Sequence, residues 1–172
     1  MKNTESGAVA YLPQSKYGKN SEVSINDNSS YYTGGGSGTS YRTNVGQSTT
    51  GDVTGIYDMS GGAWEYVAGY VGNGGSYGSS LVNAPARYKD TYSSYTAPTS
   101  GGHYGDAVWE TSSSSSGSSS WYSDYSYFPD SGSFFRRGGN SYYGSGAGLF
   151  YFNGSNGGAG DVYSFRVVVP VL

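Results

Sequence analysis

Few residues of this chain have side chains suited to catalysis. The sequence contains one histidine, His103, between Gly101-Gly102 and Tyr104, and it contains no cysteine. A hydrolytic triad needs a histidine base, and a zinc site needs three or four His, Cys or carboxylate ligands. The glycines around His103 favour a plain loop residue. The sequence therefore predicts a protein that is not an enzyme.

The aspartates are the other candidates for a site with charged ligands: Asp52, Asp58, Asp106, Asp124, Asp130 and Asp161. None belongs to a D-x-[DN]-x-[DN]-G loop closed by a glutamate, so the usual calcium motif is absent. We expect no cofactor, and structural calcium in an irregular oxygen cage is the alternative left open. The glycine-rich run 34–38 lacks the preceding strand and the lysine of a phosphate-binding loop, so it reads as a plain loop.

Tyrosines are concentrated in the C-terminal third, among Ser, Gly, Asn and Asp: Tyr122, Tyr125, Tyr127, Tyr142, Tyr143, Tyr151 and Tyr163. Antibody paratopes use the same residue types, because tyrosine offers a large amphipathic contact at low entropic cost. The alternative is a solvated low-complexity region. Hydrophobic residues such as Phe128, Phe134-Phe135 and Phe150 interrupt the run at intervals. These anchors favour a folded scaffold with a binding face.

Composition limits the core and the partners. Aromatic residues make up 17% of the chain and charged residues 12%, with a net charge of −3. Buried rings can supply the core of such a chain, and we assign Trp64, Trp121 and the phenylalanines to it. Arg166, between Phe165 and Val167, is interpreted as a buried arginine paired with a carboxylate. Without clustered Lys and Arg we expect no nucleic-acid partner, and without an apolar run of ~18 residues we expect no membrane insertion.

The elements that must position these side chains are short. A helix is predicted over 4–16, with Thr4 as its cap and a stop or bend near Leu12, because Pro13 cannot continue the backbone ladder. Strands are predicted at 23–25, 134–137, 148–152 and 163–169, and a turn at 60–62 precedes the core-directed Trp64 and Val67. The range 105–111 is predicted as a short helix or strand, and 33–51 and 112–120 as loops.

Three segments resemble motifs of formylglycine-generating-enzyme (sulfatase-modifying factor) domains. The sequence GIYDMSGGAWEYV at 55–67 is similar to their GLYDMxGNVWEW signature, RGG at 137–139 to an internal step, and FRVV at 165–168 to their closing GFRVV. The resemblance covers nearly the whole chain. It implies a loop-rich α+β fold of the C-type-lectin type over residues 1–172, with short antiparallel strands and one or two helices.

A narrower resemblance is to lectin-fold proteins of phages and prophages of gut Firmicutes, some of which are the variable proteins of diversity-generating retroelements. It implies that residues 121–169 form a variable region whose side chains are exchanged by errors at template adenines. The displayed positions that this resemblance implies are Tyr122, Ser123, Tyr127, Ser133, Ser141, Tyr142, Tyr143, Asn153, Gly154, Ser155, Asn156, Asp161, Val162 and Tyr163.

The chain also departs from these families. It lacks the cysteines of formylglycine chemistry and the several histidines of the iron-dependent sulfoxide synthases. The phage proteins carry Trp where this chain has Ser6 and Ser24, and they extend further toward the N-terminus, so we expect the N-terminal part of the family domain to be missing here.

These observations predict a non-catalytic protein that binds a protein or cell-surface ligand, as a receptor-binding or surface-display protein does. The expected location is a virion, such as a phage tail, or the bacterial cell surface. The alternative is a structural or decoration protein whose tyrosines make subunit contacts.

Overall fold

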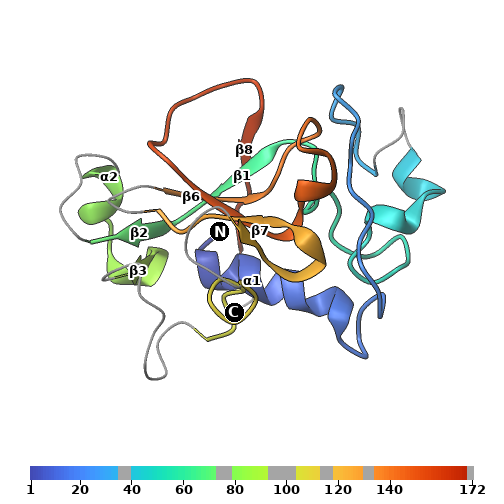
Figure 1. The fold of residues 1–172 in the computed structure, drawn as a ribbon, viewed down its shortest axis with the longest axis horizontal. Helices are drawn as coiled ribbons and strands as arrows, with labels where there is room; N and C mark the ends of the chain where they lie inside the picture. Colours follow the sequence, from blue (N-terminus) through green and yellow to red (C-terminus); the bar gives the residue numbers. More distant parts are fainter. Residues whose placement is uncertain (35–39, 73–78, 93–103, 113–117, 130–133, 170–172) are drawn as a thin grey trace.

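In the computed structural model, a six-stranded sheet and helix α1 form the centre of a mixed α+β fold (Figure 1). The structure describes residues 1–34, 40–72, 79–92, 104–112, 118–129 and 134–169. The long segment between α1 and β1 lies at one end of the sheet, and β2, α2 and β3 lie at the opposite end (Figure 1). His103, Asp130 and Ser133 fall outside the described residues.

Helix α1 (Asn3–Tyr11) confirms the predicted N-terminal helix with different ends. Lys2, rather than Thr4, is the N-cap residue, and its N–H donates to Glu5 Oε2 at 2.7 Å. The α-helix ends at Tyr11 and continues as the 3-10 helix η1 (Leu12–Gln14). Pro13 lies in that turn, as expected for a residue without an N–H.

The large sheet is mixed, in the order β4-β5-β7-β6-β1-β8. Its strands are β1 (Trp64–Val67), β4 (Ser118–Ser119), β5 (Tyr125–Ser126), β6 (Phe134–Gly138), β7 (Gly148–Ser155) and β8 (Tyr163–Phe165). The pairs β1–β6, β6–β7 and β4–β5 are antiparallel, as predicted, whereas β1–β8 and β5–β7 are parallel.

The remaining elements are small. Strands β2 (Gly69–Val71) and β3 (Asp90–Tyr92) form a parallel pair, with helix α2 (Ser79–Val82) between them in the chain. Single 3-10 turns are η2 (Ser40–Arg42), η3 (Val45–Gln47), η4 (Ala86–Tyr88), η5 (Trp121–Ser123) and η6 (Gly144–Gly146).

The strand predictions succeed only where long-range partners exist. Strands β6, β7 and β8 confirm the predictions at 134–137, 148–152 and 163–169, although β7 is longer and β8 shorter than expected. The strand predicted at 23–25 is wrong, because only Asn26 forms an isolated bridge, with Gly61. Turns occupy 104–111 in place of a helix or strand, and β4 lies in the range predicted as loop.

The core is rich in aromatic residues, as the composition predicts. One cluster contains Phe128, Phe135, Phe152 and Tyr92 with three valines, and a second lies beside α1 around Phe150, Leu149 and Met59. Trp64 is not part of either cluster, because β1 directs Glu65 and Val67 into the core and Trp64 to the opposite face.

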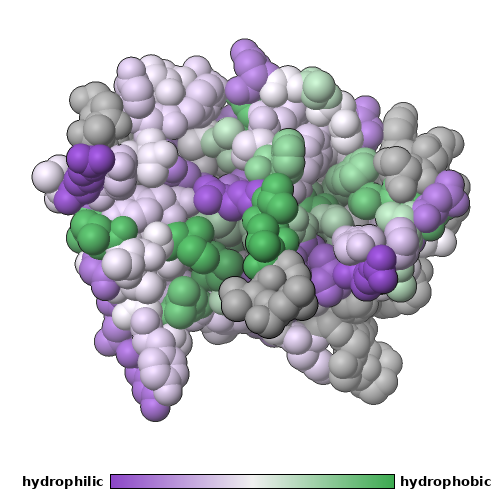
Figure 2. Space-filling view, turned by 180° about the vertical axis from the view of Figure 1, so that it is seen from behind, coloured by the Kyte–Doolittle hydropathy of each residue, from purple (hydrophilic) through white to green (hydrophobic). Residues whose placement is uncertain are grey.

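Within the described ranges, no helix is long and apolar enough to cross a bilayer. Apolar side chains do reach the surface, and Figure 2 shows a group of them on the side opposite the view of Figure 1. The most exposed apolar side chains of the C-terminal segment are Phe165, Val167 and Val169, each 75–80% accessible.

Candidate ligand-binding face

Strands β1, β6, β7 and β8 separate their side chains onto two faces. Along β1 and the first four residues of β6, buried residues alternate with partly exposed ones, as the pleat of a strand requires, whereas the first five residues of β7 are all buried. One face, here called the inner face, carries Glu65, Val67, Phe135, Arg137 and Phe152, which are all buried. The outer face carries Trp64, Tyr66, Phe134, Arg136, Asn153, Ser155 and Tyr163. The strand register places Tyr66 opposite Arg136 and Arg136 opposite Asn153.

Rings cross the outer face in a continuous line, here called the aromatic row: Phe134, Tyr66, Tyr163, Trp64, Tyr143, Tyr151 and Tyr125. Successive ring centroids from Phe134 to Tyr151 lie 5.1–5.9 Å apart. The Trp64 and Tyr163 rings are stacked, with 24° between their planes. Such contacts favour one orientation of each ring.

Arg136 lies within the aromatic row. Its Cζ is 4.6 Å from the Trp64 ring centroid, and its Nη1 donates to Tyr163 Oη at 3.3 Å. The guanidinium therefore contacts one aromatic ring through its face and another through its hydroxyl. Arg136 Nε is buried and has no partner among the described residues. The contacts leave a positive charge at the centre of an otherwise neutral aromatic surface.

Hydroxyl and amide groups extend the outer face beyond the rings. Tyr66 Oη bonds to Ser155 Oγ at 2.8 Å and donates to the carbonyl of Gly158 at 2.9 Å. Asn153 Nδ2 donates to Tyr151 Oη at 3.4 Å. Burial raises the pKa of Tyr151 and of Tyr125, with Tyr143 adding to both shifts. These phenols are therefore neutral hydrogen-bonding groups at physiological pH.

A cavity opens beside the aromatic row. It has a volume of about 260 Å³ and is lined by Tyr66, the glycine-rich segment 157–160, and the β8 residues Tyr163, Ser164 and Phe165. The small residues 157–160 line one part of this cavity, and the rings of Tyr66, Tyr163 and Phe165 line another. Such a hollow accepts one side chain or ring of a ligand lying on the outer face.

The structure brings several of the predicted displayed positions together. Tyr143, Asn153, Ser155 and Tyr163 lie on the outer face. Asn156, Asp161 and Val162 lie in the segment between β7 and β8, and Tyr142 is 71% exposed just before η6. Tyr127 is partly exposed directly after β5, where its N–H donates to the Phe152 carbonyl.

Four other predicted positions lie away from this surface. Tyr122 and Ser123 belong to η5, and Tyr122 contacts Gln14 and the Phe150 ring beside α1. Ser141 is buried, and its N–H donates to the Gly62 carbonyl at 2.7 Å. Gly154 faces inward, where a Cβ would lie 2.6 Å from Pro129 Cβ.

Sequence reasoning missed part of the surface, namely Trp64, Tyr66, Phe134 and Arg136. The assignment of Trp64 and Phe134 to the core is wrong, because both residues lie on the outer face. It is also wrong for Trp121 and Phe165, which are 45% and 75% exposed. The alternation Trp-Glu-Tyr-Val and the doublets Phe-Phe-Arg-Arg are the signals that could have identified them, since a strand directs neighbouring residues to opposite faces.

The aspartates that the structure describes do not gather into a metal site. Among the residues that the structure describes, no group of three or more His, Cys, Asp or Glu side chains could hold a metal ion. Asp106 and Asp124 are both buried, and Asp52 closes a turn with Thr50 and Thr54. The irregular calcium cage stays a prediction.

No protein-family model, no curated protein and no solved structure matches this chain.

Proposed function

We propose that the protein is a non-catalytic binding module whose outer sheet face recognises a protein or cell-surface ligand. The observation that carries this proposal is the aromatic row with Arg136 at its centre. Six rings and a guanidinium reach one surface, and the seventh ring, Tyr151, is buried against Tyr125 and Tyr143. Tyrosine, tryptophan and arginine are the residues that most often dominate binding energy at protein interfaces.

The physical basis is preorganisation. The rings are fixed by one another and by hydrogen bonds to Ser155 and Gly158, so a ligand would order few side chains on binding. Ordering a flexible side chain at an interface costs about 0.5–1.5 kcal/mol. A surface that avoids this cost binds well with ordinary contacts. Variation at Asn153, Ser155 and Tyr163 would then change the ligand without changing the fold.

The test is affinity capture followed by variant binding. The biotinylated protein is used to capture ligands from bacterial surface extracts, and a recovered ligand is titrated by calorimetry against Tyr163→Ala and Trp64→Ala. We expect each change to weaken binding by at least about tenfold, as for a hot spot of ~1.4–2 kcal/mol. Tyr17→Ala is the matched control, because Tyr17 is 75% exposed in the turn after η1 and belongs to no strand of the sheet. Equal loss in the control, or none in either face variant, would contradict the proposal.

We further propose that this surface belongs to a C-type-lectin-like domain diversified by a retroelement, in a phage or surface-display protein. The motifs at 55–67 and 165–168 support it, together with the clustering of four predicted variable positions on the outer face. The test is to sequence the DNA flanking the gene. A second copy of the segment for Trp121 to Val169, different only at adenines, is expected. Absence of any copy would leave a fixed binding surface.

A second candidate function is assembly, and the exposed apolar end of the chain favours it. Phe165, Val167 and Val169 are 75%, 75% and 80% exposed next to β8, an edge strand. Exposed apolar residues at a sheet edge are typical of subunit contacts. Light scattering during size-exclusion chromatography would show an oligomer, which Val167→Lys should dissociate. A monomer at all concentrations would exclude this candidate.

A further inference from the structure

Strand β8 ends the large sheet with an open edge. One edge of β8 pairs with β1, and among the described residues no strand pairs with the other edge. The side chains along this segment are not covered either, since Phe165 is 75% exposed and Val167 and Val169 continue the exposed line beyond the strand. An open edge presents backbone N–H and C=O groups to any chain that can pair with them.

The backbone of β8 divides its hydrogen-bonding groups between its two edges. The Trp64 N–H donates to the Val162 carbonyl at 2.9 Å, and the register places Trp64 beside Tyr163. In a parallel ladder a residue bonds to the two neighbours of its partner, so the groups of Val162 and Ser164 that bond are directed to β1. Because neighbouring residues of a strand direct their N–H and C=O groups to opposite edges, those of Phe165 are directed to the open edge.

An uncharged hollow adjoins this edge on the outer face. It is the cavity of about 260 Å³ beside the aromatic row, and all three residues of β8 line it together with Tyr66. The register places Tyr66 opposite Phe165, so the hollow follows the strand itself. The segment 157–160 adds only glycine and alanine to the lining. Rings and small residues without charge suit an apolar side chain.

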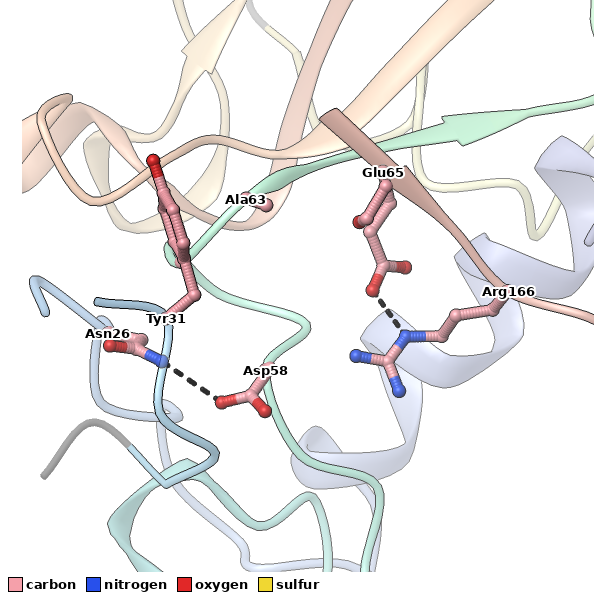
Figure 3. A pocket seen from close by; sticks show the side chains of 8 residues that line it. Asn26, Tyr31, Asp58, Ala63, Glu65 and Arg166 are labelled. Carbon is pink, nitrogen blue, oxygen red and sulfur yellow. Dashed lines mark hydrogen bonds and ion pairs between the residues drawn. The ribbon is translucent and has the colours of Figure 1, made fainter. Parts of the chain in front are cut away.

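A second hollow, of about 200 Å³, lies beside β8 on the side of the inner-face residue Glu65. Ser164 lines both hollows, so the same short strand borders one on each face. Figure 3 shows the Glu65–Arg166 ion pair on one side of the second hollow and the Tyr31 ring on the other. Its charged groups already have partners, so this hollow suits a small uncharged polar side chain rather than an ion.

We propose that the open edge of β8 binds an extended peptide segment of the ligand, which adds to the large sheet as a further strand. This inference rests on the proposed function and names the class of ligand. Side chains of an added strand alternate between the two faces, so successive ligand residues reach the two hollows in turn. Backbone hydrogen bonds then supply affinity, and the hollows select an apolar residue next to a small polar one.

A separate peptide fits this edge better than a second copy of the chain. A second copy would bring the same three-residue strand, and its exposed segment is followed directly by Pro170. Very short edge strands and proline residues are features that protect natural sheets from pairing edge to edge. A ligand segment can be longer and free of proline, so it can pair with the whole open edge.

The probes are capped pentapeptides, acetyl-Thr-X-Ser-Val-Thr-amide, in which X is Phe, Leu or Ile. Each is titrated into the ¹⁵N-labelled protein, and exchange of the backbone amides with deuterium is followed by NMR. At saturation the Phe165 N–H is expected to exchange at least about tenfold more slowly, because it becomes hydrogen-bonded to the peptide. The Ser164 N–H, which is directed to β1, is the internal control and should keep its exchange rate.

Methylation of the peptide backbone separates strand addition from binding through side chains. One derivative of the tightest peptide is N-methylated at X and another at Ser. An added strand directs only every second N–H toward β8, so one derivative should bind at least about tenfold more weakly and the other like the parent peptide. Binding through side chains alone would treat the two derivatives alike.

Phe165→Pro is the decisive variant. It removes the N–H at the open edge and leaves the groups that bond to β1 in place, which is where an edge strand tolerates proline. Calorimetry should show at least about tenfold weaker peptide binding than for Phe165→Ala, the matched control that loses the same ring but keeps the N–H. If Phe165→Pro fails to fold, the two methylated peptides still decide the question with the unchanged protein.

Four results would overturn the proposal: no saturable binding of any of the peptides, unchanged exchange of the Phe165 N–H, equal binding of the two methylated derivatives, or equal binding by the two Phe165 variants. Slower exchange at Phe165 that grows with protein concentration, without peptide, would assign the edge to a second copy instead. The proposed function is judged separately. If Trp64→Ala weakens binding of the captured ligand but no peptide binds, only the edge proposal fails, and the converse result removes only the outer-face proposal.

Discussion

The two faces of the central sheet are built from the same strands, but one face is buried in the core and the other is partly exposed. Phe135, Arg137 and Phe152 point inward and are 0–1% exposed, whereas their chain neighbours Phe134, Arg136 and Asn153 point outward and are partly exposed. Both faces are rich in aromatic rings. The inner rings exclude water from the core, and the outer rings contact one another at the surface. Aromatic content alone therefore does not distinguish the core from the exposed face of the sheet.

Arg136 and Arg137, which are neighbours in β6, show the same contrast between an exposed and a buried charge. Arg137 is fully buried and donates to the carbonyls of Asp106 and Ala107, so its charge serves the fold. Burial lowers the pKa of Arg137, and nearby Asp106 opposes that shift. Arg136 instead lies over Trp64 at the surface, where its charge can meet a ligand. The comparison predicts that inner residues control stability and outer residues control binding.

The strongest test of this separation is a pair of alanine substitutions. Phe135→Ala should lower the free energy of unfolding by about 3–5 kcal/mol, because it leaves a cavity among Phe128, Tyr92 and Phe152. Phe134→Ala, one residue earlier, should cost less than about 1.5 kcal/mol, because its ring is half-buried. Urea denaturation followed by tryptophan fluorescence measures both. Equal costs would show that the outer rings belong to the core.

A pH series sharpens the comparison. Burial raises the pKa of Asp124 from 3.8 to about 7 and that of Asp106 to about 6. The folded state then binds more protons than the unfolded state between pH ~4 and ~7. Stability should be highest near pH 4 and should fall as pH rises through this window, by a few kcal/mol at ~1.4 kcal/mol per pKa unit.

The matched variant for the pH series is Asp124→Asn, which should flatten the part of the fall between pH 6 and 7 and keep an acceptor for the Phe150 N–H. Ligand binding by the outer face, as proposed, should change little over the same range, because the aromatic row contains no carboxylate or imidazole. Thermal denaturation at each pH measures the stability of the protein and of the Asp124→Asn variant. A stability that rises from pH 4 to 7 would contradict the buried-acid assignment.

Gly154 tests where the boundary between the faces lies along β7. Gly154→Ala should destabilise the protein by about 1–3 kcal/mol, since the new Cβ would meet Pro129 at 2.6 Å. Asn153→Ala, on the outer face, should change stability by about 0.5 kcal/mol or less. Differential scanning calorimetry compares the two. If Gly154→Ala leaves the stability unchanged, Gly154 belongs with the displayed positions of the outer face.

The smallest effect is expected at Tyr142, a predicted position whose side chain is largely exposed. Tyr142→Ala should change the free energy of unfolding by less than about 0.5 kcal/mol, because the side chain is 71% exposed. The measurement is the same urea titration. A larger loss would mean that Tyr142 packs against the protein, and the outer surface would then be smaller than proposed.

The sequence predicted much of this arrangement from local signals. Tyr, Ser, Gly and Asn between phenylalanine anchors indicated a surface near β7 and β8, and Pro13 located the end of α1. The predicted pairing of Arg166 with a carboxylate is confirmed by its ion pair with Glu65. These features depend on neighbouring residues, so the local pattern is informative. The isolated Val23-Ser24-Ile25 alternation failed, because a strand needs a partner that the pattern does not contain.

The sequence by itself determined the residue types: an aromatic core, a tyrosine-rich C-terminal third, and too few histidines and cysteines for their usual chemistry. Only the tertiary structure decided which rings face water. Strand pairing brings Trp64 beside Tyr163 from 99 positions along the chain, and it sends Gly154 inward and Tyr122 to the α1 side. A strand alternates its faces whatever its partners are, but long-range packing decides which face the core covers.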